Sequence, residues 1–146
     1  MLPIDKGMSG RRPQKNICVS LSGWEKVAKA PAVLIVEDEP LVRLGAVRII
    51  EDAGFEVIEV ANADEAIRVL ESRSDIRVIF TDIQMPGSMD GLKLAHAVRH
   101  RWPPIKIVVT SGRELATEQD LPEGGRFFRK PYDPIAVCET LRELVL

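Results

Sequence analysis

The stretch that most constrains the fold covers residues 78–87, with the sequence VIFTDIQMPG. Apolar residues run directly into the carboxylate of Asp82, and Pro86 and Gly87 then break the chain. A short apolar run closed by proline and glycine is typical of a buried parallel strand that ends in a loop. Asp82 is therefore predicted at the carboxyl end of a central strand, where open α/β sheets bind their ligands. Burying a carboxylate there is costly unless cations lie near it.

Strand patterns and helix patterns alternate along the rest of the domain. The predicted strands cover residues 33–36, 55–60, 77–81, 105–109 and 126–129, and the predicted helices begin near Pro40, Asn62, Asp90 and Asp133. Asn62 with Glu65 three residues later is a capping-box pattern. Residues 113–119 have little apolar support, so the fourth of five helices should be short or irregular. This alternation predicts a doubly wound parallel sheet covered on both faces.

Composition and charge exclude several classes of protein. A length of 146 residues suits one domain, and no apolar run approaches the roughly 18 residues of a membrane span. Residues 1–30 carry a net charge of +4 and residues 31–146 a net charge of −6, a distribution that argues against nucleic-acid binding. Two cysteines far apart in the sequence, Cys18 and Cys138, indicate reduced thiols and a cytoplasmic location.

Residues 1–30 show no sustained hydrophobic period. We expect them to form a poorly ordered extension ahead of a domain at 31–146. A docking segment between residues 17 and 27 is the less favoured alternative.

Polar side chains follow four of the predicted strands. Glu37 and Asp38 follow the first, Asp82 ends the third, Thr110 follows the fourth and Lys130 the fifth. Parallel strands place all these ends at one edge of the sheet. With the flavodoxin-like strand order 2-1-3-4-5, these side chains would share one pocket.

Such a pocket suits phosphoryl transfer. Crowded carboxylates raise one another's pKa, and a hard divalent cation relieves that repulsion. Mg²⁺ is the expected cofactor, with Asp38 and Asp82 as direct ligands and Glu37 acting through a water. A free Asp82 oxygen can then attack phosphorus, while Lys130 and Thr110 hold phosphoryl oxygens.

Each of these residues has a simpler explanation when it is taken alone. Acidic residues favour helix N-termini, Asp82 could be an ordinary turn residue, Thr110 a strand-end hydroxyl and Lys130 a solvated cation. Their occurrence together, in order on successive strand ends, favours the phosphoryl-transfer hypothesis.

The motifs around these residues resemble one known family over about residues 32–146. They are VLIVEDEP at 33–40, TDIQMP at 81–86, MDG at 89–91, VTSG at 109–112 and FRKP at 128–131. As a set they are similar to the receiver domain of two-component response regulators.

The resemblance implies a role for each matching residue. Asp82 would be the phosphoacceptor, and Glu37 and Asp38 the acidic pair. Gln84 would offer a backbone carbonyl to Mg²⁺. Thr110 would be the switch hydroxyl and Lys130 the phosphate-binding lysine, and the bond before Pro131 would be cis. The aromatic switch position is Phe127, which lacks the hydroxyl of the tyrosine common there.

The resemblance also implies a function. The chain is expected to be a stand-alone receiver that accepts a phosphoryl group from a histidine kinase or phosphotransfer protein and signals through an unknown partner protein. It would not be an enzyme beyond self-phosphorylation and slow self-dephosphorylation, and a weak homodimer is a possible assembly. A phosphate sink and a non-phosphorylated pseudo-receiver remain as alternatives.

Two other classes of protein share parts of this pattern. An aspartate-nucleophile phosphatase of the haloacid dehalogenase kind would need a second aspartate where this chain has Gln84. A flavin-binding module would need a phosphate-binding loop after the first strand, where residues 37–39 are all acidic. Both are disfavoured.

Overall fold

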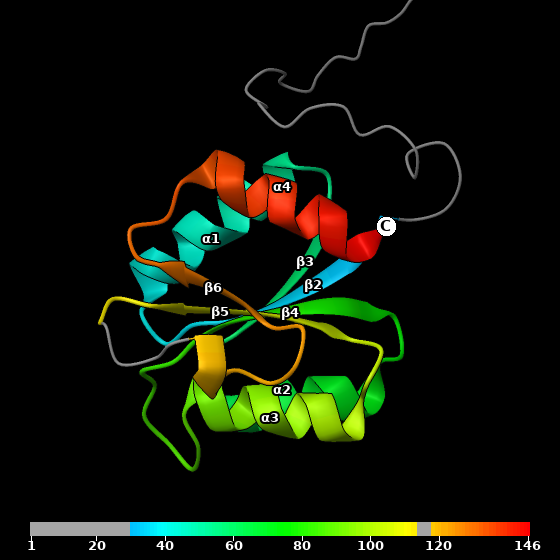
Figure 1. Cartoon of the computed structure of the whole chain (residues 1–146), viewed down its shortest axis with the longest axis vertical. Helices are drawn as coiled ribbons and strands as arrows, with labels where there is room; N and C mark the ends of the chain where they lie inside the picture. Colours follow the sequence, from blue (N-terminus) through cyan, green and yellow to red (C-terminus); the bar gives the residue numbers. More distant parts are fainter. Residues whose placement is uncertain (1–29, 114–117) are drawn as a thin grey trace, which may run out of the picture.

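The computed structural model describes residues 30–113 and 118–146, which form a three-layer α/β/α arrangement. The five strands are β2 (Ala32–Val36), β3 (Glu56–Val60), β4 (Ile76–Asp82), β5 (Lys106–Ser111) and β6 (Arg126–Arg129). The helices are α1 (Pro40–Asp52), α2 (Ala63–Ser72), α3 (Gly91–Arg101), α4 (Pro134–Val145) and the 3-10 helix η2 (Glu118–Asp120). Figure 1 shows α1 and α4 on one face of the sheet and α2 and α3 on the other.

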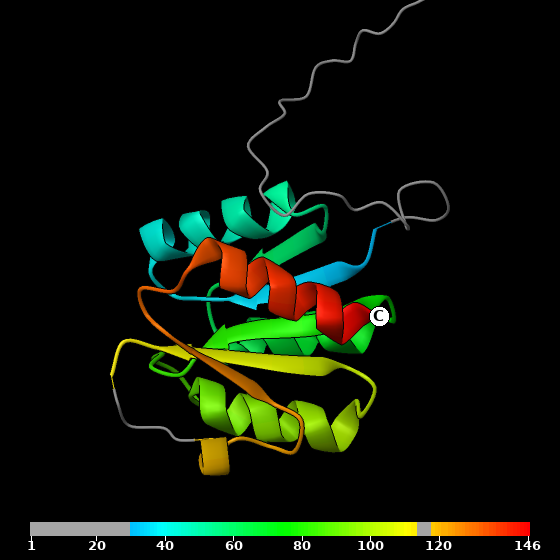
Figure 2. The same cartoon turned by 45° about the horizontal axis from the view of Figure 1, so that its top comes forward.

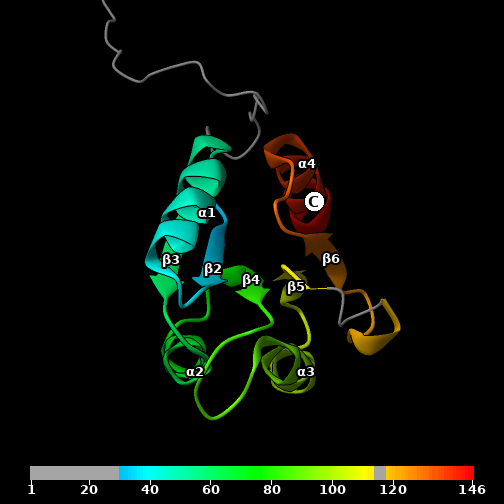
Figure 3. The same ribbon diagram turned by 90° about the vertical axis from the view of Figure 1, so that its left-hand side faces the viewer.

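All strand pairs are parallel, and the sheet order is β3-β2-β4-β5-β6. This confirms the predicted order 2-1-3-4-5 and the flavodoxin-like class. The view in Figure 3 runs nearly along the strands and shows the helices paired above and below them. The carboxyl ends of all five strands therefore lie at one edge of the sheet.

Alternation along the strands divides the core between the two faces. Val33, Ile35 and Phe80 point toward α1 and α4, while Leu34 and Ile79, one residue away along the same strands, point toward α2 and α3. Figure 2 shows α4 lying across the strands on the side that also carries α1. Because β2 and the middle of β4 are covered on both faces, residues 32–36 and 78–80 form continuous apolar runs in the sequence.

Local sequence signals place the helix starts. The Asn62 side chain accepts a hydrogen bond from the Glu65 amide at 2.9 Å, and Glu65 Oε1 accepts one from the Ala61 amide at 2.9 Å. The Asn62 half of the predicted capping box is formed, whereas Glu65 reaches the amide of Ala61, one residue before the N-cap, instead of the Asn62 amide. The Asp90 side chain accepts the Lys93 amide at the start of α3, and the Asp133 side chain accepts the Ile135 amide at the start of α4.

The carboxyl ends of two strands lie beyond the predicted ranges. β4 ends at Asp82, one residue past the range 77–81 but at the position predicted for this carboxylate, and β5 extends through Thr110 and Ser111 instead of ending at residue 109. Asp82, Thr110 and Ser111 are therefore the last residues of their strands, because their backbones still pair with the neighbouring strands.

Two further predictions, the short fourth helix at 113–119 and the extension at 1–30, concern residues that the structure describes only in part. The weak stretch 113–119 is described at Arg113 and in η2, while residues 114–117 lie outside the description. The expected extension at residues 1–30 likewise lies outside it, apart from Ala30.

Candidate functional site

Strand register brings the predicted site residues together at the carboxyl edge of the sheet. Asp82 on β4 pairs directly with Thr110 on β5. Val36 pairs with Thr81, so Glu37 follows β2 at the level of Asp82. The Lys130 amide donates to the Ser111 carbonyl oxygen at 2.9 Å, which fixes the start of the loop after β6.

The Lys130 ammonium group bridges two buried carboxylates. Its Nζ atom lies 3.0 Å from Glu37 Oε1 and 3.0 Å from Asp82 Oδ1. Glu37 is 4% exposed and Asp82 5% exposed, so both charges are almost completely removed from bulk solvent. The second Glu37 oxygen accepts the Glu39 amide at 3.2 Å. One cation therefore ties together β2, β4 and β6 at this edge.

Burial sets the electrostatics of these groups. Desolvation raises the pKa of Glu37 and of Asp82, although the Lys130 ammonium opposes both shifts. Burial acts to lower the pKa of Lys130, but its hydrogen bond to Glu37 and its ion pair with Asp82 outweigh that effect and raise it. The pocket thus holds more negative charge than one lysine can neutralise.

The third carboxylate, Asp38, completes an acidic cluster. One carboxylate oxygen from each of Glu37, Asp38 and Asp82 lies within 4.8 Å of the others. Asp82 Oδ1 is buried and, among the described residues, accepts no aligned hydrogen bond, so only its ion pair with Lys130 compensates it. Three carboxylates with oxygens at this spacing, and the buried Asp82 Oδ1 without a hydrogen-bond donor among the described residues, fit a divalent cation such as Mg²⁺.

A second group of polar side chains lies beside the carboxylates. Thr110 is 1% exposed and is the sheet neighbour of Asp82. The Ser111 hydroxyl donates to Gln84 Oε1 at 2.9 Å and accepts from the Arg113 amide at 3.0 Å. The Gln84 side-chain oxygen is therefore engaged with β5.

The predicted switch residue, Phe127, faces the other side of the sheet from Phe128. Phe127 packs against the cluster formed with α2 and α3, whereas Phe128 packs against the α1 and α4 cluster. Phe127 pairs in register with Val109, the residue before Thr110. The Lys130–Pro131 bond is cis, as predicted.

Two supporting residues were missed by the sequence reasoning. A Cβ atom built on Gly91 would lie 1.8 Å from the Asp82 carbonyl oxygen, so only glycine allows α3 to approach the backbone of Asp82 this closely. Arg43 on α1 donates from Nη1 to the Glu37 carbonyl oxygen at 2.8 Å and pairs with Glu59 at 3.0 Å. The Asp90-Gly91 motif is a sequence signal for the first, but no sequence pattern indicates the second.

Comparisons with known proteins identify the family of this chain. The family model described as "Response regulator receiver domain" matches residues 33–142, so the chain belongs to that family. It is 34% identical over 117 residues to the sensor kinase CckA of Brucella abortus, covering 77% of this chain and 12% of that protein. It is 36% identical over 121 residues to the hydrogenase transcriptional regulatory protein HoxA of Cupriavidus necator, covering 80% and 24%.

Solved structures give the same result. A response regulator receiver protein from Sinorhizobium medicae superposes with a TM-score of 0.73 at 26% identity, covering 80% of this chain and 94% of that one. The receiver domain of the hybrid histidine kinase CckA superposes with a TM-score of 0.67 at 30% identity, covering 79% and 99%.

Family membership fixes the general role. The chain is a receiver domain of two-component signal transduction, and receiver domains bind Mg²⁺ at an acidic pocket of this kind. The chain spans at most about a quarter of the length of the curated relatives described above. Among residues 30–113 and 118–146, no helix is long and apolar enough to cross a membrane.

Proposed function

We propose that Asp82 is the phosphoacceptor of this receiver domain and that a histidine kinase or a phosphotransfer protein is its donor. The observation that carries the proposal is the position of the Asp82 carboxylate, buried beside Glu37 and Asp38 and paired with Lys130 at 3.0 Å. No other described group of three or more acidic, histidine or cysteine side chains has this compact arrangement.

The chemistry follows from the charges of the site. An Asp82 carboxylate oxygen attacks the phosphorus, the bond between phosphorus and the donor breaks, and the leaving group takes the electron pair. An ionised carboxylate needs no general base. Asp38, Asp82 and the Gln84 backbone carbonyl would hold Mg²⁺, with Glu37 acting through a water. The bound ion would neutralise negative charge on the phosphoryl oxygens.

Lys130 has a distinct part in this proposal. Its ammonium bridges Glu37 and Asp82 before phosphorylation and is positioned to pair with a phosphoryl oxygen afterwards. Thr110 supplies a hydroxyl donor from the adjacent strand. Phosphorylation would thus exchange carboxylate–lysine contacts for phosphoryl contacts within the same pocket.

The output is proposed to pass through β5 and β6. Movement of Thr110 toward the phosphoryl group would shift Val109 and its register partner Phe127, which packs on the α2 and α3 face. We further propose that the receiver domain signals through a partner protein.

The direct test is incubation of the full chain with acetyl phosphate and Mg²⁺, followed by intact-mass measurement. One added phosphoryl group is expected on the wild type and none on Asp82→Asn. A matched control is Asp52→Asn, which changes an exposed carboxylate at the end of α1 and should label like the wild type. Equal labelling of Asp82→Asn, or no labelling of the wild type, would defeat the proposal.

A further inference from the structure

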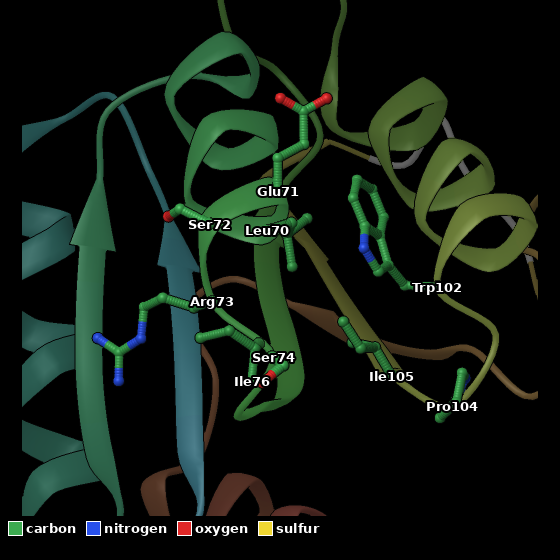
Figure 4. A pocket seen from close by; sticks show the side chains of 9 residues that line it. All are labelled: Leu70, Glu71, Ser72, Arg73, Ser74, Ile76, Trp102, Pro104 and Ile105. Carbon is green, nitrogen blue, oxygen red and sulfur yellow. The ribbon is translucent and has the colours of Figure 1, made fainter.

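A cleft of about 410 Å³ opens between the carboxyl-terminal ends of α2 and α3. In Figure 4, Leu70 from α2 and Trp102 from the end of α3 face each other, with Ile76 and Ile105 below them. Leu70, Ile76 and Ile105 are buried, while Trp102 is only partly covered. The cleft therefore offers an apolar interior with an aromatic wall, of a size typical of binding pockets.

This cleft lies far from the phosphoryl-transfer site. Ile76 and Ile105 stand at the amino ends of β4 and β5, whereas Asp82 and Thr110 stand at their carboxyl ends. A phosphodonor must approach the carboxyl edge of the sheet, so a donor bound near Asp82 would leave the cleft at the amino edge open to a different occupant.

The described chain starts next to the cleft. Ala32, the first residue of β2, pairs in register with Ile76, which lines the cleft. Both side chains belong to the cluster on the α2 and α3 face. The Pro31 carbonyl oxygen accepts the Glu56 amide at 2.9 Å, so the chain ahead of β2 joins the sheet at this same edge.

The preceding sequence has the chemistry to fill an apolar cleft. Residues 17–27 read ICVSLSGWEKV, with five aliphatic or aromatic side chains among eleven residues. Residues 1–30 carry a net charge of +4 against −6 for residues 31–146, so their mutual attraction favours return of the segment to its own domain. Trp24 is eight residues before Ala32, a span of up to about 26–29 Å when extended, and adjacent strands are only about 5 Å apart.

We propose that residues 17–27 dock intramolecularly in the cleft between α2 and α3, with Trp24 as the apolar anchor against Trp102. The amphipathic indole suits a pocket whose interior is apolar and whose lining also includes the polar residues Glu71, Arg73 and Ser74, with Glu71 paired to Arg101 at 2.9 Å. This proposal is independent of phosphorylation at Asp82.

Tryptophan fluorescence of the full chain tests the proposal. The chain has two tryptophans, so Trp102→Phe leaves Trp24 as the single reporter while keeping an apolar wall. We expect a blue-shifted Trp24 emission and several-fold weaker acrylamide quenching than for free N-acetyltryptophanamide. Emission and quenching equal to those of the free compound would overturn the proposal.

A charge placed at the cleft mouth should release the anchor. Adding Ser74→Lys to the reporter variant places a positive charge at an exposed position of the cleft lining, where it would repel the positively charged segment 1–30. Acrylamide quenching of Trp24 should then rise toward the value for free N-acetyltryptophanamide. Leu44→Lys is the matched control, because it adds the same charge to an exposed position of α1 on the opposite face. If Ser74→Lys changes nothing, Trp24 is protected elsewhere and the proposal fails.

A spin label separates docking within one chain from docking between copies. A nitroxide on Cys18, in a full chain with Cys138→Ala, should broaden the amide signals of Ser74 and Ile76 and the Trp102 indole signal, but not those of Thr110. Mixing spin-labelled chain with unlabelled, ¹⁵N-enriched chain should produce no broadening. Broadening in the mixed sample would assign the cleft to a second copy and overturn the intramolecular proposal, as would broadening in neither sample.

Discussion

The close approach of Gly91 to Asp82 makes a prediction that joins stability to function. In Gly91→Ala, the new Cβ atom would start 1.8 Å from the Asp82 carbonyl oxygen and 2.7 Å from its carbonyl carbon. The neighbouring atoms are backbone, and they must separate by about 1.2 Å to reach the 3.0 Å below which real Cβ contacts essentially never occur. The Asp82 backbone or the start of α3 must therefore move.

Two magnitudes follow from that displacement. Forcing a methyl group into a filled site typically costs about 1–3 kcal/mol of the free energy of unfolding. A reacting group misplaced by about 1 Å can lose roughly 10²-fold in rate. We therefore expect Gly91→Ala to fold, to unfold at lower urea concentration, and to label with acetyl phosphate about 10²-fold more slowly.

Gly45→Ala is the matched control for this experiment. Gly45 lies in the interior of α1, and a Cβ atom there would meet nothing within 4 Å. Alanine is the better helix former by about 1 kcal/mol, so this variant should be slightly more stable and should label at the wild-type rate. Urea unfolding and the time course of intact mass measure both variants. If Gly91→Ala is as stable as the wild type and labels at the same rate, the approach of α3 to the Asp82 backbone does not depend on a glycine at position 91.

Three further substitutions test the charges and the caps. Lys130→Met in Mg²⁺-free buffer should lower the free energy of unfolding by about 3 kcal/mol, because it leaves buried carboxylates without a cation. The control is Lys106→Met, which removes an exposed lysine, and equal urea midpoints for the two variants would contradict this prediction. Asp38→Asn should weaken Mg²⁺ affinity by at least about tenfold, measured from the Mg²⁺ dependence of the melting temperature. If the melting temperature of Asp38→Asn depends on Mg²⁺ as that of the control Asp52→Asn does, Asp38 is not a Mg²⁺ ligand. Asn62→Ala should cost about 1 kcal/mol in thermal unfolding through loss of the α2 cap while acetyl phosphate labelling stays unchanged, and an unaltered melting temperature would show that the cap contributes nothing.

The phosphoryl-transfer site shows how far a local pattern reaches. Apolar runs ending in acidic, hydroxyl or basic residues predicted which residues would stand at the strand ends, because parallel strands share one direction. The structure adds that Lys130 contacts Glu37 and Asp82 at the same distance, although 93 residues separate Lys130 from Glu37. The roles of these residues in phosphorylation remain predictions for the experiments above.

The sequence by itself determined the strand and helix alternation, the residues near which the four α-helices begin and the residue types gathered at the carboxyl edge. These features depend on side-chain periodicity and on hydrogen bonds between near neighbours, which a linear pattern records. Only the tertiary structure decided that Gly91 touches the Asp82 backbone, that Arg43 donates to the Glu37 carbonyl, and that an apolar cleft opens beside the start of β2. Those features depend on how closely helices pack against the sheet, and that packing is set by side-chain volumes summed over the whole core.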